Sequence, residues 1–320
     1  MNRDLPAALL QDLHEVPGFD PKAFEAVHAQ SQAPASLRLH PVKPSCTFDQ
    51  LGEPIPWCPS GRYLPERPSY VFDPAWHAGA YYVQEASSMF LWQALSQTVG
   101  SHTSEKWVLD LCAAPGGKST LLQSFFLDGM VVSNEIIKSR TAILAENSTK
   151  WGMGNDVITQ NDPADFAALP HFFDVLVIDA PCSGSGLFRR DPQAIDEWSP
   201  AQVLVCAQRQ EKILAAALPC LKPGGVLIYS TCSYSLAENE ALADYLALEQ
   251  GLVSLTLQTD PSWNIVETSA PRSGAKGYRF YPHRLRGEGF YLSVFQKMGE
   301  AEPYEGKSST PVLPTKKWLD

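Results

Sequence analysis

Two cysteines directly follow apolar, strand-like runs and are the side chains best suited to covalent chemistry. Cys182 lies in IDAPCSGSG after FDVLVIDA, and Cys232 lies in YSTCSYS after GGVLIYST. If these runs are adjacent parallel strands, both thiols reach the same rim of one sheet although they are far apart in the sequence. A lone cysteine is usually an inert core residue. A pair at two strand exits instead predicts reactive thiols.

A thiolate beside a methyl donor suits methylation of a pyrimidine at carbon 5, which is not nucleophilic in the resting ring. Addition of the thiolate to carbon 6 makes carbon 5 enamine-like and able to attack a sulfonium methyl group, and a base must then remove the carbon 5 proton. Asp179, at the end of FDVLVIDA, is placed to serve ring nitrogen 3 or the amino group. An amino methyltransferase would carry a D/N-P-P-aromatic turn where this chain has DAPC. On this chemistry alone, either thiol can be the nucleophile.

The turn LDLCAAPGGKST runs from a strand into a helix, where small residues let backbone amides approach a ligand. It lacks the G-x-G-x-x-G of a dinucleotide fold. Gly117, Lys118 and Ser119 fit the end of a phosphate-binding loop, but Cys112 stands at its first glycine position. A P-loop nucleotide triphosphatase is therefore an alternative, since FDVLVIDA also resembles a strand ending in a magnesium-holding Asp. S-adenosylmethionine, which carries no polyphosphate, fits the turn better.

Two further carboxylates follow predicted strands and suit a nucleoside cofactor. Glu135 ends VVSNE, where an acidic residue can bind ribose hydroxyls, and Asp162 in TQNDPADF is placed for the adenine. Ordinary solvated loop carboxylates are the alternative for both. The seven cysteines include no C-x-x-C, which argues against a zinc cluster or a disulfide framework, so we expect no metal and a reducing compartment.

Strand-like and helix-like segments alternate through most of the chain. Strands are predicted over 107–111, 131–135, 156–160, 173–180, 224–231 and 290–297, and helices over 116–129, 138–152, 199–221 and 236–251. Such alternation predicts an α/β fold, an open, mostly parallel, Rossmann-like sheet with helices on both faces. Ligands of such sheets lie outside the carboxyl ends of the strands, where the residues above are expected.

The two ends of the chain differ from this central part. Residues 1–80 contain scattered prolines and predict a small N-terminal α+β module, followed by the α/β domain over 81–298. Residues 299–320 are aperiodic and contain Pro and Ser, so a linker or tail is expected there.

Composition limits the kinds of partner. Of 320 residues, 44% are hydrophobic, which excludes a disordered chain, and a net charge of −10 means that nucleic acid must bind at a local basic patch. No apolar run approaches the roughly 20 residues of a membrane span, and the start lacks the features of a signal peptide. We expect a cytoplasmic protein without membrane association.

The chain resembles the Sun/nucleolar-protein family of S-adenosylmethionine-dependent RNA (cytosine-5) methyltransferases. The similarity lies in VQEASSM, LDLCAAPGGK, NE followed by Arg140, IDAPCSGSG, RRDP, KPGGVLIYSTCS and GEGFYLSVF, and covers roughly residues 38–297. IPWC, the EASSM form and DPQAIDEWSP are most similar to bacterial members that methylate 16S ribosomal RNA. The resemblance implies a Rossmann-like class I methyltransferase fold and action on 16S rRNA or the small subunit, by a monomer. It also implies that the module of residues 1–80 contacts RNA and that residues 81–298 are a methyltransferase domain. Another RNA such as tRNA is an alternative substrate, and a non-catalytic rRNA-binding protein is an alternative of another class.

Site residues follow from the same resemblance. It implies that Cys232 is the nucleophile, that Cys182 helps to release the methylated product, and that Lys118 and Asp179 are active-site groups. DNA cytosine methyltransferases attack with the Pro-Cys thiol, so the resemblance decides between the two cysteines. The implied cofactor-binding residues are Cys112, Ala113, Ala114, Pro115, Gly116, Gly117, Lys118, Glu135, Arg140, Asp162 and Asp179.

The sequence departs from the family pattern at few places. His40 follows Arg38 in RLHPVK where Asn is more usual, and Cys112 stands where a small residue is common. The bacterial 16S rRNA members carry a C-terminal RNA-binding extension, so we expect this chain to be a fragment or a shortened member.

A basic segment over 272–286 is the predicted RNA contact. It holds five Lys or Arg residues and no carboxylate, with Tyr278, Phe280 and Tyr281 interleaved, a pattern that suits backbone neutralisation and base stacking on unpaired RNA. The target cytidine is expected to be unpaired or flipped, because carbon 6 is inaccessible inside a helix. The predicted RNA-binding residues are Arg38, Lys43, Arg189, Arg190, Arg279 and His283.

Overall fold

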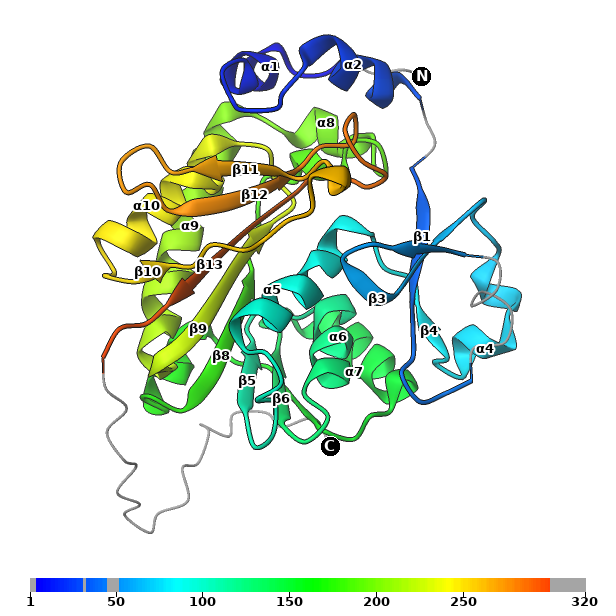
Figure 1. Ribbon diagram of the computed structural model, residues 1–320, viewed down its shortest axis with the longest axis vertical. Coiled ribbons are helices and arrows are strands. Elements are labelled where there is room, and N and C mark those ends of the chain that lie inside the picture. The colour runs from blue at the N-terminus through cyan, green and yellow to red at the C-terminus, as the bar shows by residue number, and fades with distance from the viewer. Residues whose placement is uncertain (1–3, 31–32, 45–51, 300–320) are drawn as a thin grey trace.

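The computed structural model describes residues 4–30, 33–44 and 52–299, whose strands form a large and a small sheet (Figure 1). Within these residues the large sheet runs β11-β12-β13-β9-β8-β5-β6-β7, with β10 paired to β13. Its parallel half consists of β5 (Trp107–Asp110), β6 (Met130–Asn134), β7 (Asp156–Thr159), β8 (Phe173–Asp179) and β9 (Leu221–Thr231). Its antiparallel half consists of β10 (Val253–Ser254), β11 (Val266–Ser269), β12 (Lys276–Phe280) and β13 (Phe290–Gln296).

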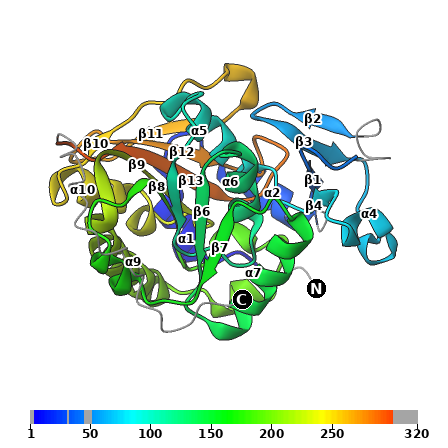
Figure 2. The same ribbon diagram turned by 90° about the horizontal axis from the view of Figure 1, so that it is seen from below.

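Helices cover both faces of the large sheet (Figure 2). One face packs against α5 (Leu91–Thr98), α6 (Gly117–Phe125) and α7 (Lys138–Trp151), and the other packs against α9 (Pro200–Ala217) and α10 (Glu240–Leu248). Alternate residues of β8 enter the two cores, Val175 and Val177 on one side and Leu176 and Ile178 on the other. A strand that is covered on both faces is apolar throughout, which explains FDVLVIDA. The predicted α/β fold with helices on both faces is confirmed.

The order of the strands in the large sheet determines where this sheet can bind a ligand. The chain passes from β5 to β6 and β7 on one side, then crosses to β8 and β9 on the other, so the topological switch point lies between β5 and β8. In open α/β sheets this is where ligands bind, outside the carboxyl ends of the strands. Short helices and turns border this edge, namely η2 (Ser87–Phe90), η3 (Pro163–Ala168), η4 (Ser185–Leu187), α8 (Gln193–Glu197) and η6 (Leu236–Glu238).

The N-terminal residues form two separate structures (Figure 1). Helices α1 (Ala7–Leu13) and α2 (Pro21–Ala29) pack through Leu13 and Phe24 onto Tyr234 and Tyr281 of the main domain. The small sheet has the order β2-β3-β1-β4, formed by β1 (Ala35–Leu39), β2 (Glu53–Ile55), β3 (Cys58–Leu64) and β4 (Tyr81–Tyr82), with α4 (Pro74–His77) beside it. Residues 300–320, predicted as linker or tail, lie outside the described residues.

Arg38 joins the small sheet to the main domain. Its side chain is fully buried, donates to Thr120 Oγ1 (2.5 Å) and Ser124 Oγ (3.3 Å) of α6, and lies 4.4 Å from the centre of the Trp151 ring. A buried guanidinium that uses its donors on protein groups is not available to a phosphate. The prediction that Arg38 contacts RNA is therefore wrong, and its role is to hold β1 against α6.

His40 lies beside Arg38 at the same contact between the small sheet and the main domain. Its burial makes the stability of the folded protein depend on pH. Its Nδ1 accepts hydrogen bonds from the Val42 and Lys43 amides, and its Nε2 lies 3.0 Å from the Trp151 carbonyl oxygen. Burial lowers the pKa of His40 to about 4. An unfolded chain takes up a proton near pH 6.5, so between these values the unfolded state binds more protons and the folded protein loses stability as the pH falls.

We expect the His40→Asn variant to lose less stability than the wild type between pH 7 and pH 4.5. Asn can accept from the turn amides but does not titrate. Thermal unfolding measured across this range, with each protein compared with its own value at pH 7.5, tests the expectation. Parallel pH curves for the two proteins would contradict it.

None of the helices in residues 4–30, 33–44 and 52–299 combines the length and apolar character needed to cross a membrane.

Candidate active site

The turn between β5 and α6 brings backbone groups to the switch point. Gly116 has a φ of +112°, in the left-handed region that favours glycine, and α6 begins at the next residue. The turn is held from three sides, because Arg140 donates to the Ala114 carbonyl oxygen (2.7 Å), Asn147 donates to that of Pro115 (2.8 Å), and the Ala113 amide donates to that of Asn134 (2.8 Å). The first amides of α6 therefore face the carboxyl edge of the sheet.

Asn134 ties together three strand ends. It donates to the carbonyl oxygens of Leu111 and Asn161 and accepts from the Asn161 amide and the Thr159 hydroxyl. The next residue, Glu135, is 3% exposed, and its Oε1 accepts from the Ile137 amide. Its Oε2 receives no hydrogen bond within the described part of the chain, and Arg140 Nη1 lies 3.3 Å away.

This donor and acceptor set fits the expected nucleoside cofactor. The buried Glu135 Oε2 can accept from a ribose hydroxyl, since buried carboxylate oxygens are normally hydrogen-bonded. Asp162 follows β7 and is exposed at the same edge, with one oxygen accepting from the Ala164 amide. Cys112, half-buried in the turn itself, has its pKa raised by burial and is a neutral thiol.

The two predicted thiols meet at the rim of β8 and β9. Cys182 Sγ and Cys232 Sγ are 3.1 Å apart, and the Gly186 amide donates to the Cys232 carbonyl oxygen. The hydrogen bond with Cys232 raises the pKa of Cys182, as do its burial and the nearby negative charge of Glu238. Cys182 is therefore held as the neutral thiol. Among the other described cysteines, Cys206 and Cys220 are buried.

Asp179 and Lys118 form an ion pair between the cofactor turn and the thiols. Lys118 Nζ lies 2.8 Å from Asp179 Oδ2, and Ser230 donates to the other oxygen at 2.7 Å. The ammonium also lies 5.1 Å from the centre of the Phe290 ring. Both carboxylate oxygens are thus fixed at the end of β8, where they can receive a further hydrogen bond from a bound base.

Several residues of this edge were not predicted from the sequence. Ser230 fixes Asp179, Asn134 joins the strand ends, and Glu238 bonds to the loops of both cysteines. Asp110, at the end of β5, is fully buried and accepts from Ser119 Oγ at 2.7 Å, and burial raises its pKa to about 7. A polar residue directly after an apolar strand is the signal that points to Asp110 and Asn134.

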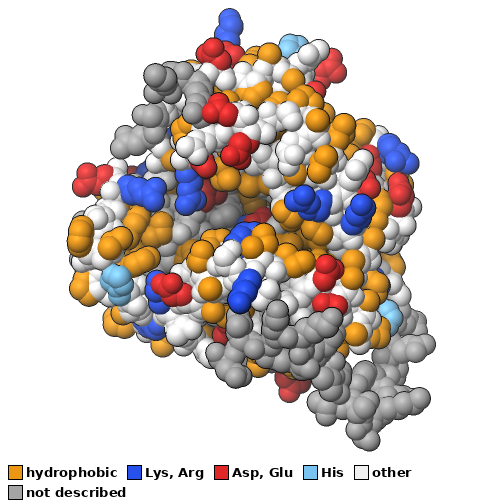
Figure 3. Space-filling model, turned by 180° about the vertical axis from the view of Figure 1, so that it is seen from behind, with side chains coloured by type: hydrophobic (Ala, Val, Ile, Leu, Met, Phe, Trp, Pro, Cys, Tyr) orange, Lys and Arg blue, Asp and Glu red, His pale blue; other side chains and the backbone are white. Residues whose placement is uncertain are grey.

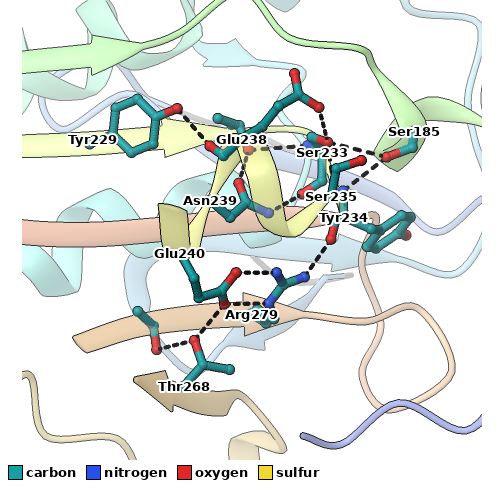
Figure 4. Close-up of polar contacts among 12 residues, drawn as sticks. Ser185, Tyr229, Ser233, Tyr234, Ser235, Glu238, Asn239, Glu240, Thr268 and Arg279 are labelled. Atoms are coloured by element: carbon teal, nitrogen blue, oxygen red, sulfur yellow. Dashed lines mark hydrogen bonds and ion pairs between the residues drawn. The ribbon is translucent and has the colours of Figure 1, made fainter. Parts of the chain in front are cut away.

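In the predicted basic RNA contact over 272–286, the aromatic side chains and Arg279 are not accessible to RNA. Tyr278 and Phe280 of β12 are fully buried in the core that also contains α5 and α6, and the adjacent Tyr281 is buried against Phe24 and Tyr234. Arg279 is buried too, and it pairs with Glu240 and donates to the Tyr234 carbonyl oxygen (Figure 4). The alternation of aromatic and basic residues reflects a strand.

Three other predicted RNA contacts are engaged within the protein. The His283 ring lies 3.2 Å from the Gly18 carbonyl oxygen and packs against Phe24, and Lys43 donates to the carbonyl oxygens of Ala78 and Lys150. The side chain of Arg189 is 5% exposed and lies 3.5 Å from Glu288, an ion pair that is itself mostly buried. These three are poor candidates for direct phosphate contacts. Arg190 is exposed and remains a candidate.

Arg190 lies in a basic groove between the small sheet and the main domain. We define the basic groove by Arg67, Arg190, Arg286 and Tyr82; an open pocket of about 450 Å³ lies beside the three arginines. A second pocket of about 300 Å³ continues from Arg67 and Arg190 past Tyr82 to Pro115 of the cofactor turn. Figure 3 shows a hollow on this face with Lys and Arg side chains around it. The groove thus leads to the candidate active site.

Two family models match the chain. One, described as 16S rRNA methyltransferase RsmB/F, matches residues 98–296, and another, described as the N-terminal domain of 16S rRNA methyltransferase RsmF, matches residues 5–86. Ribosomal RNA small subunit methyltransferase F of Serratia proteamaculans is 33% identical over an alignment of 315 residues, which covers 93% of this chain and 64% of that protein. The protein of the same name from Salmonella arizonae is 37% identical over an alignment of 241 residues, which covers 70% of this chain and 50% of that protein.

The chain thus spans about half to two thirds of the length of these relatives. Among solved structures, NSun6 from Pyrococcus horikoshii with SFG has a TM-score of 0.70 at 19% identity, covering 92% of this chain and 99% of that one. A methyltransferase homolog protein, also from Pyrococcus horikoshii, has a TM-score of 0.68 at 25% identity, covering 92% of this chain and 100% of that one. These likenesses show that the chain shares the overall fold of these proteins.

Proposed function

This chain belongs to the RsmB/F family of 16S rRNA methyltransferases, and we propose that it transfers a methyl group from S-adenosylmethionine to carbon 5 of a cytidine in RNA, with 16S rRNA as the expected substrate. Membership confirms the predicted resemblance to the Sun/nucleolar-protein family and its bacterial 16S rRNA branch. The observation that carries the proposal is the pair of thiols 3.1 Å apart, beside the Lys118–Asp179 ion pair at the carboxyl edge.

Each group at the edge has a chemical task in this reaction. The bound cofactor supplies an electrophilic methyl group, held by the turn at 112–118 and by Glu135, Arg140 and Asp162. Cys232 adds as the thiolate to carbon 6 of the cytosine, which makes carbon 5 nucleophilic. Asp179, fixed by Lys118 and Ser230, accepts from the amino group of the base and orients the ring.

Release of the product requires the reverse elimination. After methylation a base removes the carbon 5 proton, carbon 5 and carbon 6 regain their double bond, and the bond from carbon 6 to Cys232 Sγ breaks. Cys182 Sγ, 3.1 Å from the departing sulfur, is the side chain placed to assist this step. In accordance with the family resemblance, we assign Cys232 to attack and Cys182 to release.

Methyl-labelled S-adenosylmethionine, 16S rRNA and small ribosomal subunits provide the direct test. After incubation, the RNA is digested to nucleosides, and we expect the label in 5-methylcytidine. Label in another nucleoside, or bound cofactor without any label in RNA, would contradict the proposed function.

We further propose that RNA reaches the site along the basic groove, with the small sheet of the N-terminal module on one side and the methyltransferase domain on the other. Arg67 and Arg190 are exposed and line both pockets along the groove. Exposed arginines neutralise phosphates, and the half-buried Tyr82 offers a ring near the cofactor turn.

The double variant Arg67→Glu/Arg190→Glu is expected to bind RNA about 10- to 100-fold more weakly at moderate salt, because two phosphate contacts are lost and two repulsive charges gained. The slope of log Kd against log salt should fall by about 2. Fluorescence anisotropy with a labelled rRNA fragment measures both. The matched control, Arg209→Glu/Lys212→Glu, makes the same charge change at exposed positions of α9. Equal losses in both double variants would mean that net charge, not the groove, determines affinity.

A further inference from the structure

Glu238 is a buried carboxylate between the loops that carry the two thiols (Figure 4). It lies at the end of η6, shortly after Cys232, and its side chain is 0% exposed. Within the described residues no Lys or Arg forms an ion pair with it. Burying a carboxylate without a cation is unfavourable unless hydrogen bonds replace the lost water. The Glu238 carboxylate must therefore be stabilised by hydrogen bonds from its neighbours.

Four hydrogen bonds satisfy the carboxylate, and three of them come from the residues that directly follow the thiols. Oε1 accepts from the Ser183 amide (2.8 Å) and from Gln210 Nε2 (3.1 Å). Oε2 accepts from the hydroxyls of Ser183 and Ser233, each at 2.5 Å. Glu238 thus joins the residue after Cys182 to the residue after Cys232.

Neighbouring side chains hold Glu238 itself in place. Gln210 of α9 also donates to the Pro181 carbonyl oxygen, and the Tyr229 hydroxyl donates to the Glu238 carbonyl oxygen at 2.7 Å. The adjacent Asn239 donates to the Ser233 carbonyl oxygen and accepts from Thr231 Oγ1. The carboxylate is therefore a fixed link between two loops whose separation it can control.

We propose that Glu238 is a positioning residue that holds Cys182 and Cys232 at the separation needed for attack and release. This inference rests on the proposed function for its catalytic consequence, although the geometry that it assigns does not. A misplacement of about 1 Å can reduce a rate on the order of 100-fold. The negative charge also has a second effect, since it helps to keep Cys182 in the neutral form.

The nearby pair of Glu240 and Arg279 has a different task. It bonds to the Tyr234 carbonyl oxygen and to Thr268 of β11, so it ties the loop after Cys232 to the antiparallel half of the sheet. Within the described part of the chain, this pair forms no hydrogen bond with the residues that follow Cys182. Among these two buried carboxylates, Glu238 is the one that spans both thiol loops.

Thiol cross-linking tests the assigned geometry without RNA. Diamide oxidises two neighbouring thiols to a disulfide, the thiols losing two protons and two electrons as the diazene becomes a hydrazine. In the wild type we expect rapid formation of the 182–232 disulfide, identified by mass spectrometry of the linked peptides. In Glu238→Ala the rate should fall at least about 10-fold, because the link between the loops is lost. In Glu238→Gln it should stay close to the wild-type rate, because the serine hydroxyls can turn and donate or accept.

Turnover supplies the second measurement. Glu238→Ala should lower kcat on the order of 100-fold while the KM for RNA and the affinity for S-adenosylmethionine change little. Glu238→Gln should retain most of kcat. Glu249→Gln, an exposed change at the end of α10, is the matched control and should behave as the wild type in both experiments.

The outcomes separate this inference from the proposed function. Unchanged cross-linking and unchanged kcat in Glu238→Ala would overturn the positioning role. Slow cross-linking in Glu238→Ala with no methylation by the wild type would support the role and contradict the function. If Glu238→Ala does not fold, the Ser183→Ala/Ser233→Ala double variant removes two of the four bonds, and a wild-type cross-linking rate in that protein would overturn the inference.

Discussion

Replacement of Cys232 by alanine is expected to abolish methyl transfer, with a loss of at least about 1000-fold in the single-turnover rate. Without the thiolate, carbon 5 of cytosine does not become nucleophilic, and the other groups of the site cannot replace that step. Label transfer from methyl-labelled S-adenosylmethionine to RNA measures the effect. Binding of S-adenosylmethionine and of RNA should persist, because Cys232 lies outside the cofactor turn and the basic groove.

Two controls test whether the loss of methyl transfer is due to the missing Cys232 thiolate. Cys206→Ala removes a buried thiol of α9 that is not at the rim, and it should leave methylation unchanged. Calorimetry with S-adenosylmethionine should give the same affinity for Cys232→Ala as for the wild type. Substantial label in RNA from Cys232→Ala would show that Cys182 or another group is the nucleophile.

The positions of these groups could be predicted because they depend on a general property of parallel sheets. FDVLVIDA and GGVLIYST are apolar on both faces, so they are interior strands, and the residues after them must lie at the same edge. The same reasoning places Glu135 and Asp162. Which cysteine attacks did not follow from this geometry, since two thiols 3.1 Å apart are nearly equivalent, and the assignment came from the family resemblance.

The RNA-contacting residues were harder to predict because charge in a sequence does not indicate exposure. Arg38 and Arg279 are fully buried with protein partners, and each partner is distant in the sequence. Arg67, by contrast, lies in a proline-rich stretch without a basic neighbour, and it becomes part of a groove when the small sheet packs beside the main domain. Glu238 was missed for the same reason, since its partner Ser183 lies on another loop.

Replacement of Cys182 by alanine is expected to trap a covalent complex between protein and RNA. Attack by Cys232 and methylation of carbon 5 should proceed, because the nucleophile and the Lys118–Asp179 pair are intact. The elimination that frees the product should become slow, since the sulfur atom 3.1 Å from the departing thiolate is absent. After denaturing electrophoresis, we expect a labelled band of protein linked to RNA, stable until the protein is digested.

The distribution of adducts between the two variants decides the assignment of roles. An adduct in Cys182→Ala and none in Cys232→Ala is the expected pattern, and Cys182→Ala should show about one labelled methyl group per protein with little further turnover. The reverse pattern would exchange the two roles while keeping the chemistry. Rapid multiple turnover by Cys182→Ala would exclude this thiol from product release, so the neutral state favoured by Cys232 and Glu238 would then serve another purpose.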